Sequence, residues 1–274
     1  MRMSARRFYW GDLTSEEFLG LDPERCIVIL PVAAIEQHGP HLPVLTDTAI
    51  ADGMVGLLRQ MLPDELQVLV LPTQAYGKSN EHILSPGTLT LPAHALLEVL
   101  TEIGASVART GLRKIVLINS HGGNTDVLGI VARELRVRHG MLCVATHWRR
   151  FGLPGGLYAA IEDRHGIHAG DIETSLMLHF RPDLVRMDKA KTFVSNAVAF
   201  EQEFAFLRAT GPHAFGWIAQ DLNAEGALGD AAVATAEKGR RTAEHQIEGM
   251  IALVRDMTAF ALSRLYASDA DALR

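Results

Sequence analysis

The sequence predicts an α/β fold built on a doubly wound, mostly parallel sheet. Short runs of apolar and β-branched residues alternate with longer segments whose apolar residues recur at helical spacing. The connections between them are short, and strands that alternate with helices in this way form parallel sheets through right-handed crossovers. The first run is apolar at successive positions, which is typical of a strand covered by helices on both faces.

Four apolar runs are the expected strands. The first is Arg25–Ala34, in which Pro31 lies near the end, where ladder hydrogen bonds are no longer required. The others follow at Gln67–Leu71, Lys114–Ile118 and Leu142–Thr146.

The expected helices follow from apolar periodicity and from residues that end helices. Gly111 stands directly after one of them, and His139 with Gly140 ends another, as is common at helix C-termini. The predicted ranges are Thr14–Leu19, Thr48–Met61, Ala93–Thr110, Thr125–Arg138 and Ala231–Leu265, the last interrupted at most near Gly239; Ile172–Phe180 is either helix or strand.

The remaining segments are expected to be irregular. Phe151–Gly166 is rich in glycine, and Thr192–Glu225 shows no clear period. No internal repeat or linker divides the chain, so we expect one domain spanning residues 1–274.

The composition is that of an ordinary globular protein. With 48% hydrophobic and 21% charged residues and a net charge of -6, the chain gives no reason to expect a nucleic acid or a membrane as partner. Its N-terminus is positively charged but lacks the apolar segment of a signal peptide, so we expect a cytoplasmic protein. Cys26 and Cys143 fall in predicted strands, which favours buried thiols over a disulfide.

A cluster of acids and histidines follows the first strand. Glu36 and His38 are two residues apart, so on an extended backbone their side chains leave the same face. Asp47 returns after a turn and could supply a second carboxylate to the same cation. Alternatively, Glu36 and His38 are ordinary polar loop residues and Asp47 caps the next helix. We interpret the cluster as half of a metal site.

Further polar residues follow the other three predicted strands. They are Glu81 and His82 after the second strand, His121 after the third, and His147 with Trp148 after the fourth. Because the carboxyl ends of parallel strands meet at one edge of the sheet, which is where ligands bind, we expect these side chains to converge there.

Two glycines follow His121 and define its surroundings. Gly122 and Gly123 would let a ligand approach the backbone and leave amides free for an anion or oxyanion, although a plain glycine-rich turn is an equal alternative. Downstream, His168 and Glu173 could complete the site, while Asp171 is better explained as a helix N-terminal acid.

Two carboxylates with two or three histidines suffice for a two-metal hydrolytic centre. The mixed nitrogen and oxygen ligands suit Zn, Mn or Fe better than Ca or Mg. The chain lacks a G-x-S-x-G nucleophile motif, a P-loop and a dinucleotide fingerprint after the first strand, so covalent catalysis and nucleotide cofactors have little support.

The same residues resemble the creatininase family of metal-dependent amidohydrolases. The matching segments run through almost the whole chain in order: 30–43 with Asp47, 76–77, 86–88, 119–124, 168–178, 229–230 and 234–239. The resemblance implies a three-layer α/β/α sandwich, a dinuclear metal site and a homohexamer.

The resemblance also assigns roles to residues. Asp47 would bridge two divalent ions, with Glu36 and His121 completing one ligand set and His38 belonging to the other. His168 matches the family's catalytic histidine, a proton shuttle. Substrate would contact Trp148, which matches a tryptophan that closes over it, and Tyr76, Gly122 and Gly123.

Two departures argue against creatinine as the substrate. Gly123 stands where creatininases have a glutamate ligand, and we expect Glu173 to fill that place as ligand and catalytic residue. The segment 162–166 lacks the tryptophan that clamps creatinine. The glycine-rich form after the third strand resembles instead the branch with formamide hydrolases and the mycofactocin-maturing peptidase.

We therefore expect a metal-dependent hydrolase that acts on carbon–nitrogen bonds other than peptide bonds. Metal-activated water would attack a lactam, a formamide or a small peptide-like amide, and His168 would protonate the leaving nitrogen. The alternatives are a metal-stabilised binding protein without activity, and an isomerase or lyase on the same centre.

Overall fold

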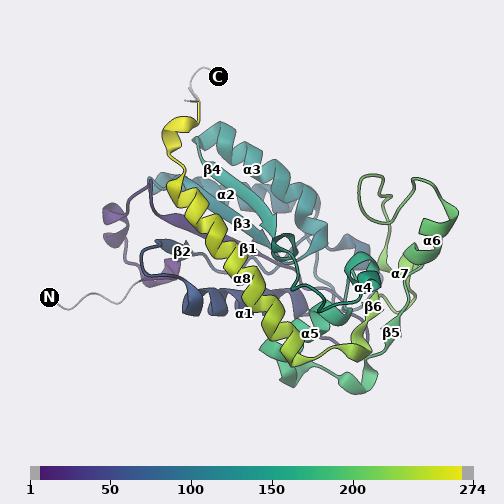
Figure 1. Cartoon of the computed structure of the whole chain (residues 1–274). Helices are drawn as coiled ribbons and strands as arrows, with labels where there is room; N and C mark the ends of the chain where they lie inside the picture. Colours follow the sequence, from purple (N-terminus) through teal and green to yellow (C-terminus); the bar gives the residue numbers. More distant parts are fainter. Residues whose placement is uncertain (1–6, 267–274) are drawn as a thin grey trace.

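The computed structural model describes residues 7–266 and shows a parallel sheet between two layers of helices (Figure 1). Residues 1–6, which hold part of the segment considered for a signal peptide, and residues 267–274 of the expected domain lie outside the described residues. The sheet has the order β2-β1-β3-β4 and all its neighbours are parallel, which confirms the predicted fold class. Its strands are β1 (Ile27–Val32), β2 (Val68–Val70), β3 (Lys114–Asn119) and β4 (Leu142–His147).

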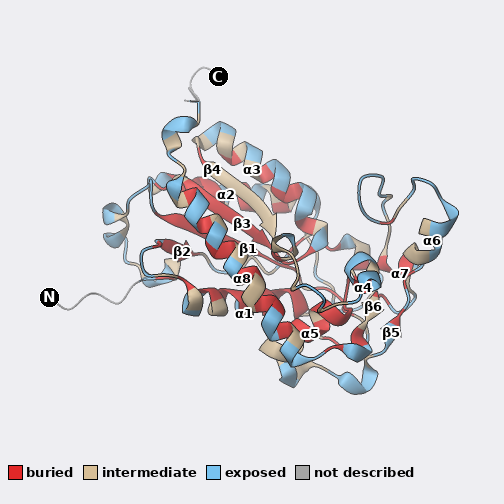
Figure 2. Ribbon diagram, in the orientation of Figure 1, coloured by how far each residue is buried: buried red, intermediate tan, exposed pale blue. Residues whose placement is uncertain are grey.

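Alternate residues of β1 pack into two separate hydrophobic clusters. Ile27 and Ile29 belong to the cluster with α1 (Thr46–Met61), α5 (Asp171–Phe180) and α8 (Ala236–Ala259). Val28 and Leu30 belong to the cluster with α2 (Ala93–Arg109) and α3 (Thr125–His139). The strand is therefore buried on both faces. Figure 2 shows β1 and β3 as buried, whereas the edge strand β4 is half-buried.

The strand register brings the carboxyl ends of three strands level with one another. Val32 of β1 lies opposite Asn119 of β3, and Asn119 lies opposite His147 of β4. The loops that follow these strands therefore leave the sheet at one edge.

Several predicted bounds need correction. Helix α1 begins at Thr46, two positions before its predicted start, so that Asp47 lies in its first turn. The expected helix at 231–265 is α8 with a short 3-10 turn on either side, and α8 continues through Gly239 without interruption. Segment 172–180, left open between helix and strand, belongs to the helix α5, which begins one residue earlier.

The expected N-terminal helix is a 3-10 turn, and the segments expected to be irregular contain short helices and a short strand. These short elements are α4 (Ala160–His165), α6 (Ala197–Glu203), α7 (Ala219–Leu222), and β5 (Thr192–Phe193), which pairs antiparallel with β6 (Gly229–Asp230). Elements this short hold too few residues to show a period. The 3-10 turns are Trp10–Asp12, Glu17–Gly20, Asn80–His82, Gly122–Asn124, Trp148–Phe151, Pro182–Leu184, Met187–Lys189, Ala231–Val233 and Leu262–Arg264.

Residues 192–230 form an excursion that extends from the carboxyl edge of the sheet (Figure 1). Both cysteines are free thiols; Cys143 lies in β4, whereas Cys26 precedes β1 by one residue. Within residues 7–266, no helix combines the length and the apolar character needed to cross a membrane.

Candidate metal centre

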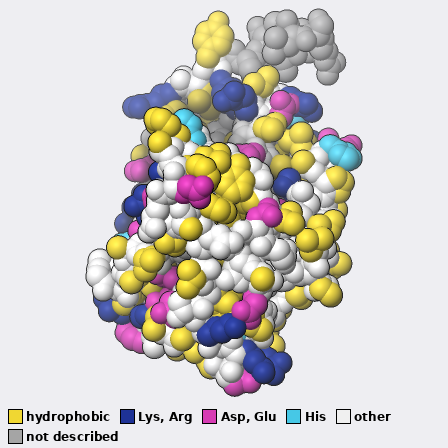
Figure 3. Space-filling view, turned by 90° about the vertical axis from the view of Figure 1, so that its right-hand side faces the viewer, with side chains coloured by type: hydrophobic (Ala, Val, Ile, Leu, Met, Phe, Trp, Pro, Cys, Tyr) yellow, Lys and Arg dark blue, Asp and Glu magenta, His cyan; other side chains and the backbone are white. Residues whose placement is uncertain are grey.

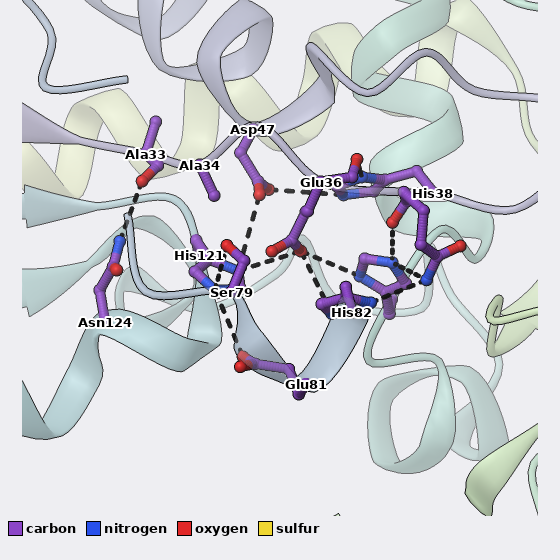
Figure 4. Close-up of polar contacts among 12 residues, drawn as sticks. Ala33, Ala34, Glu36, His38, Asp47, Ser79, Glu81, His82, His121 and Asn124 are labelled. Carbon is purple, nitrogen blue, oxygen red and sulfur yellow. Dashed lines mark hydrogen bonds and ion pairs between the residues drawn. The ribbon is translucent and has the colours of Figure 1, made fainter. Parts of the chain in front are cut away.

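Five predicted ligands come together where β1 and β3 end. Figure 4 shows Glu36, His38, Asp47 and His121 facing one another. Glu36 and His38 follow β1, Asp47 lies in the first turn of α1, and His121 follows β3. Glu173 reaches the same point from the first turn of α5. The cluster therefore draws on four segments that are far apart in the sequence.

The five side chains form two ligand sets that share Asp47. In one set, His121 Nδ1 lies 3.1 Å from Glu36 Oε1 and 3.6 Å from Asp47 Oδ2. In the other, His38 Nε2 lies 3.5 Å from Asp47 Oδ1 and 3.7 Å from Glu173 Oε2. The donor atoms of each set lie within 4.8 Å of one another. Each oxygen of Asp47 thus serves a different set, as in a carboxylate that bridges two cations.

The buried atoms of this cluster fit a pair of cations. Both carboxylate oxygens of Glu36, Nε2 of His38 and Oδ2 of Asp47 are buried and accept or donate no hydrogen bond. A buried carboxylate without a partner carries a large desolvation penalty, which a bound divalent cation would offset. The mixed carboxylate and imidazole donors suit zinc, manganese or iron.

Hydrogen bonds on the outer side of the His38 and His121 rings fix which ring nitrogen faces the centre. His38 Nδ1 lies 3.0 Å from its acceptor, Glu36 O, and His121 Nε2 lies 3.0 Å from Lys78 O. Each ring donates one N–H to a backbone carbonyl and turns its other nitrogen toward the carboxylates. This arrangement is usual for metal-ligating histidines.

The cluster changes the pKa values of its members. Burial raises the pKa of Asp47, although the imidazoles of His38 and His121 oppose this effect. Burial would lower the pKa of His38, but the carboxylates of Asp47, Glu173 and Glu36 outweigh it and raise the pKa to about 9. Each carboxylate therefore makes the neighbouring imidazole more basic, which strengthens it as a metal ligand.

His168 lies at the side of the centre that faces the large cleft described below. Its Nε2 donates a hydrogen bond of 2.7 Å to Gln37 O, and its Nδ1 lies 3.6 Å from Glu36 Oε1. Burial and the charge of His38 lower the pKa of His168 to about 3, so the ring is neutral. With Glu36 and His38 it forms a third group of donor atoms within 4.8 Å, so its place allows either a proton-transfer role or ligation.

Two further side chains at the centre, His82 and Gln37, had no role assigned from the sequence. His82 Nε2 lies 3.4 Å from Glu36 Oε1, and His82 Nδ1 lies 2.8 Å from the side-chain nitrogen of Gln37. The rings of His82 and His38 flank His168, with centroids 4.3 and 4.1 Å from it. The one signal in the sequence was the position of His82 after β2, at the same edge of the sheet.

A cleft of about 960 Å³ opens onto the centre. Its lining includes Glu36, His121 and His168 of the centre, together with Phe215 and Trp217 of the excursion. Gly122 and Gly123 also line this cleft, where they were expected to contact substrate.

Two residues expected to contact substrate lie elsewhere. Trp148 is 3% exposed, packs in the core beneath α8, and lines a separate cavity of about 50 Å³ on the Glu173 side of the centre. Tyr76 is 51% exposed and is not among the residues that line the cleft. The large cleft therefore contacts neither of them.

The start of α5 holds Glu173 in position. The backbone N–H of Ala169 donates to Glu173 Oε2 at 2.6 Å, and Ala169 has a φ of 57°, a left-handed conformation that non-glycine residues rarely adopt. Asp171 points away from the centre and pairs with Lys238 at 2.5 Å, as expected of an acid that is not a ligand.

Comparison with known proteins relates this chain to the creatininase family. The family model described as creatininase, creatinine amidohydrolase, matches residues 11–254. The mycofactocin precursor peptide peptidase of Mycobacterium ulcerans (strain Agy99) is 34% identical over 239 residues, covering 84% of this chain and 85% of the relative.

Creatininases themselves are more distant in sequence but share the fold. The creatinine amidohydrolase of Pseudomonas putida is 27% identical, covering 92% of this chain and 98% of the relative. A solved structure described as creatininase Mn is 25% identical and superimposes with a TM-score of 0.69, covering 93% of this chain and 100% of that chain.

Proposed function

The chain belongs to the creatininase family, and from this premise we propose that it is a metal-dependent amidohydrolase that cleaves a C–N amide bond. The reaction centre would be formed by the two ligand sets that share Asp47. The observation that carries the proposal is the group of buried donor atoms on Glu36, His38 and Asp47 that have no hydrogen-bond partner.

Five residues would hold two divalent ions of zinc, manganese or iron. Glu36 and His121 would bind one ion, His38 and Glu173 the other, and Asp47 both. When bound, such ions polarise a carbonyl and lower the pKa of a water molecule. Glu173 would supply the carboxylate that creatininases carry at the position of Gly123.

His168 would move the proton. Its Nε2–H is held by Gln37 O, so its Nδ1 carries the free lone pair, 3.6 Å from Glu36. A neutral imidazole in this position can accept a proton at Nδ1 from the attacking water and deliver it to the leaving nitrogen. The rings of His38 and His82 hold it in place from both sides.

The cleft favours a substrate larger than a single small ring. Its volume of about 960 Å³ lies at the upper end of ordinary ligand pockets, about 300–1,000 Å³. Phe215 and Trp217 offer apolar surface in the same cleft, where a side chain of a peptide-like substrate could lie. The similarity to mycofactocin precursor peptide peptidases points the same way, so short peptides are the first substrates to test, before lactams and formamides.

The decisive experiment combines elemental analysis with an activity panel on one protein sample. We expect about two divalent ions per chain and hydrolysis whose rate follows metal occupancy. Incorporation of ¹⁸O from labelled water into the product would separate hydrolysis from isomerisation or elimination. A sample that holds metal but hydrolyses no peptide, lactam or formamide would contradict the proposal and support a binding protein.

We also propose that the protein forms a homohexamer, as the family resemblance implies. The excursion exposes hydrophobic side chains, among them Val194, Phe204, Phe206 and Leu207. Figure 3, which views the molecule from the right-hand side of Figure 1, shows hydrophobic side chains on that surface. Light scattering after size-exclusion chromatography measures the mass directly. A mass equal to one 29.9 kDa chain would contradict the proposal.

A further inference from the structure

The outer face of His121 is surrounded by acceptors from a single turn. Its Nε2 lies 3.0 Å from Lys78 O, 3.3 Å from Ser79 Oγ and 3.4 Å from Glu81 Oε1. All three belong to the segment around the 3-10 turn at 80–82, which follows β2. Glu81 is expected at this edge of the sheet from its place after β2, but the sequence alone suggests no role for it.

Glu81 is held against the ring and does not extend into solvent. Lys78 Nζ lies 3.7 Å from Glu81 Oε2 on the side away from His121. The same Oε2 is buried and accepts no hydrogen bond. A carboxylate fixed between a cation and an imidazole has little freedom to serve as a mobile surface charge.

The space that Glu81 occupies exists because residue 123 is glycine. A Cβ added to Gly123 would lie under 3.0 Å from Glu81 Oε1, Lys78 O and His121 Nε2, which real Cβ atoms essentially never do. A Cβ added to Gly122 would meet nothing within 4 Å. Neither glycine has a positive φ, so backbone strain does not explain the difference between them.

We propose that Glu81 is a positioning residue for His121, and that Gly123 is glycine because it leaves room for the Glu81 carboxylate. Together with Lys78 O, that carboxylate accepts the Nε2–H of His121. It thereby fixes the ring so that Nδ1 faces Glu36 and Asp47. This role depends on the metal centre proposed above.

Metal affinity in the absence of any substrate tests the proposal. Zinc and manganese binding are measured by chelator competition for the wild type, Glu81→Ala and Glu81→Gln. We expect Glu81→Ala to lose about 10–100-fold in affinity, the usual effect of removing an outer partner of a metal ligand. Glu81→Gln keeps an oxygen acceptor and should recover most of the affinity, whereas a role that depends only on charge would leave it as weak as Glu81→Ala.

Two further measurements separate positioning from general stability. The melting temperature of the metal-free protein should be nearly the same for the wild type and both Glu81 variants. The absorption spectrum of the cobalt-substituted protein should change in Glu81→Ala, because the geometry of one ligand changes. Unchanged affinity and spectrum in Glu81→Ala would overturn the role of Glu81 while leaving the metal centre intact.

The glycine pair provides a matched control. Gly123→Ala should weaken metal binding, and Gly122→Ala should not. In the Glu81→Ala background, Gly123→Ala should cost less affinity than in the wild type, because one of its three close contacts is gone. Equal effects of the two alanines, or effects at Gly123 that simply add to those at Glu81, would overturn the proposed link between them. A wild-type protein that binds no divalent ion would overturn the centre and this role together.

Discussion

At the scale of single residues, Asp47 is the residue that the two ligand sets share. As an acid near the start of α1 it could have been a helix cap, and the sequence allowed both roles. The structure places it in the first turn of α1, two residues past the N-cap residue Leu45, and its two oxygens face His38 and His121. The helix dipole favours a negative charge at this position. The N-terminal end of α1 therefore favours the charged form of Asp47, which burial alone would disfavour.

His168 should affect the reaction without affecting metal content. We expect His168→Ala to lower kcat by about 100-fold or more, the usual contribution of a positioned acid or base. Elemental analysis of the variant should give the wild-type metal content, because the two ligand sets are complete without it. Loss of metal in this variant would make His168 a ligand, a role its distance to Glu36 also allows.

The two cysteines should be inert in the native protein. Burial raises the pKa of both Cys26 and Cys143 to about 12. Since the thiolate is the reactive form, and a raised pKa keeps the thiol protonated at every pH well below 12, iodoacetamide should modify neither at pH 8. Mass spectrometry after labelling in denaturant should find both modified. Rapid native labelling would contradict the burial of Cys26 or the raised pKa of Cys143, which is half-buried.

At the scale of elements, the sequence predicted the long segments and missed the short ones. The strands of the sheet and the helices α1, α2 and α3 carry enough apolar residues to show a period. The helices α4, α6 and α7 have between four and seven residues, and β5 is defined only by its pairing with β6, which lies far along the chain. Such elements depend on tertiary contacts that local sequence does not contain.

Gly239 shows how a contact between helices can resemble a helix break. The sequence suggested an interruption at this glycine, yet α8 continues through it. A Cβ at Gly239 would lie under 3.0 Å from Ser175 O, because α5 and α8 cross closely there. The glycine is therefore required by packing and not by backbone conformation.

Gly239→Ala should destabilise the protein, whereas Gly56→Ala should not. Forcing a methyl group into the α5–α8 contact should lower the free energy of unfolding by about 1–3 kcal/mol. Gly56 lies inside α1 with nothing within 4 Å of its added Cβ, so alanine there should raise stability by about 0.5–1 kcal/mol. Urea unfolding of both variants measures the difference. Two alanines of equal effect would mean that the helices do not meet at Gly239.

At the scale of the whole molecule, the sheet decides which distant residues meet. Parallel strands of matching register brought the loops after β1, β2 and β3 to one edge, and the sequence predicted this convergence. It could not predict from periodicity that α5 would direct Glu173 to the same point, a placement that came from family resemblance. The sequence also did not predict the surroundings of Trp148, because its burial under α8 depends on packing between helices.

The buried carboxylates of the centre lower the stability of the metal-free protein. Glu36 and Asp47 are almost fully buried, and several of their oxygens have no hydrogen-bond partner. Without a cation, these carboxylates must remain charged in a low-dielectric site or take up protons. The protein should therefore depend on metal for stability as well as for reaction.

Metal removal should lower the melting temperature of the protein. Free metal at 100 times its dissociation constant stabilises the fold by about 2.7 kcal/mol. For a chain of this size that corresponds to about 5–10 °C in melting temperature, lost on treatment with a chelator. Calorimetry with and without metal measures this increment.

Asp47→Asn removes one buried charge and the ligand shared by both sets. The metal-free variant should melt above the metal-free wild type, because a neutral amide costs less to bury than a carboxylate whose pKa burial raises. Adding metal should then give little or no further increase, since neither ligand set is complete. If the metal-free variant melts below the metal-free wild type, or gains as much from metal, Asp47 is a structural acid and not the shared ligand of two cations.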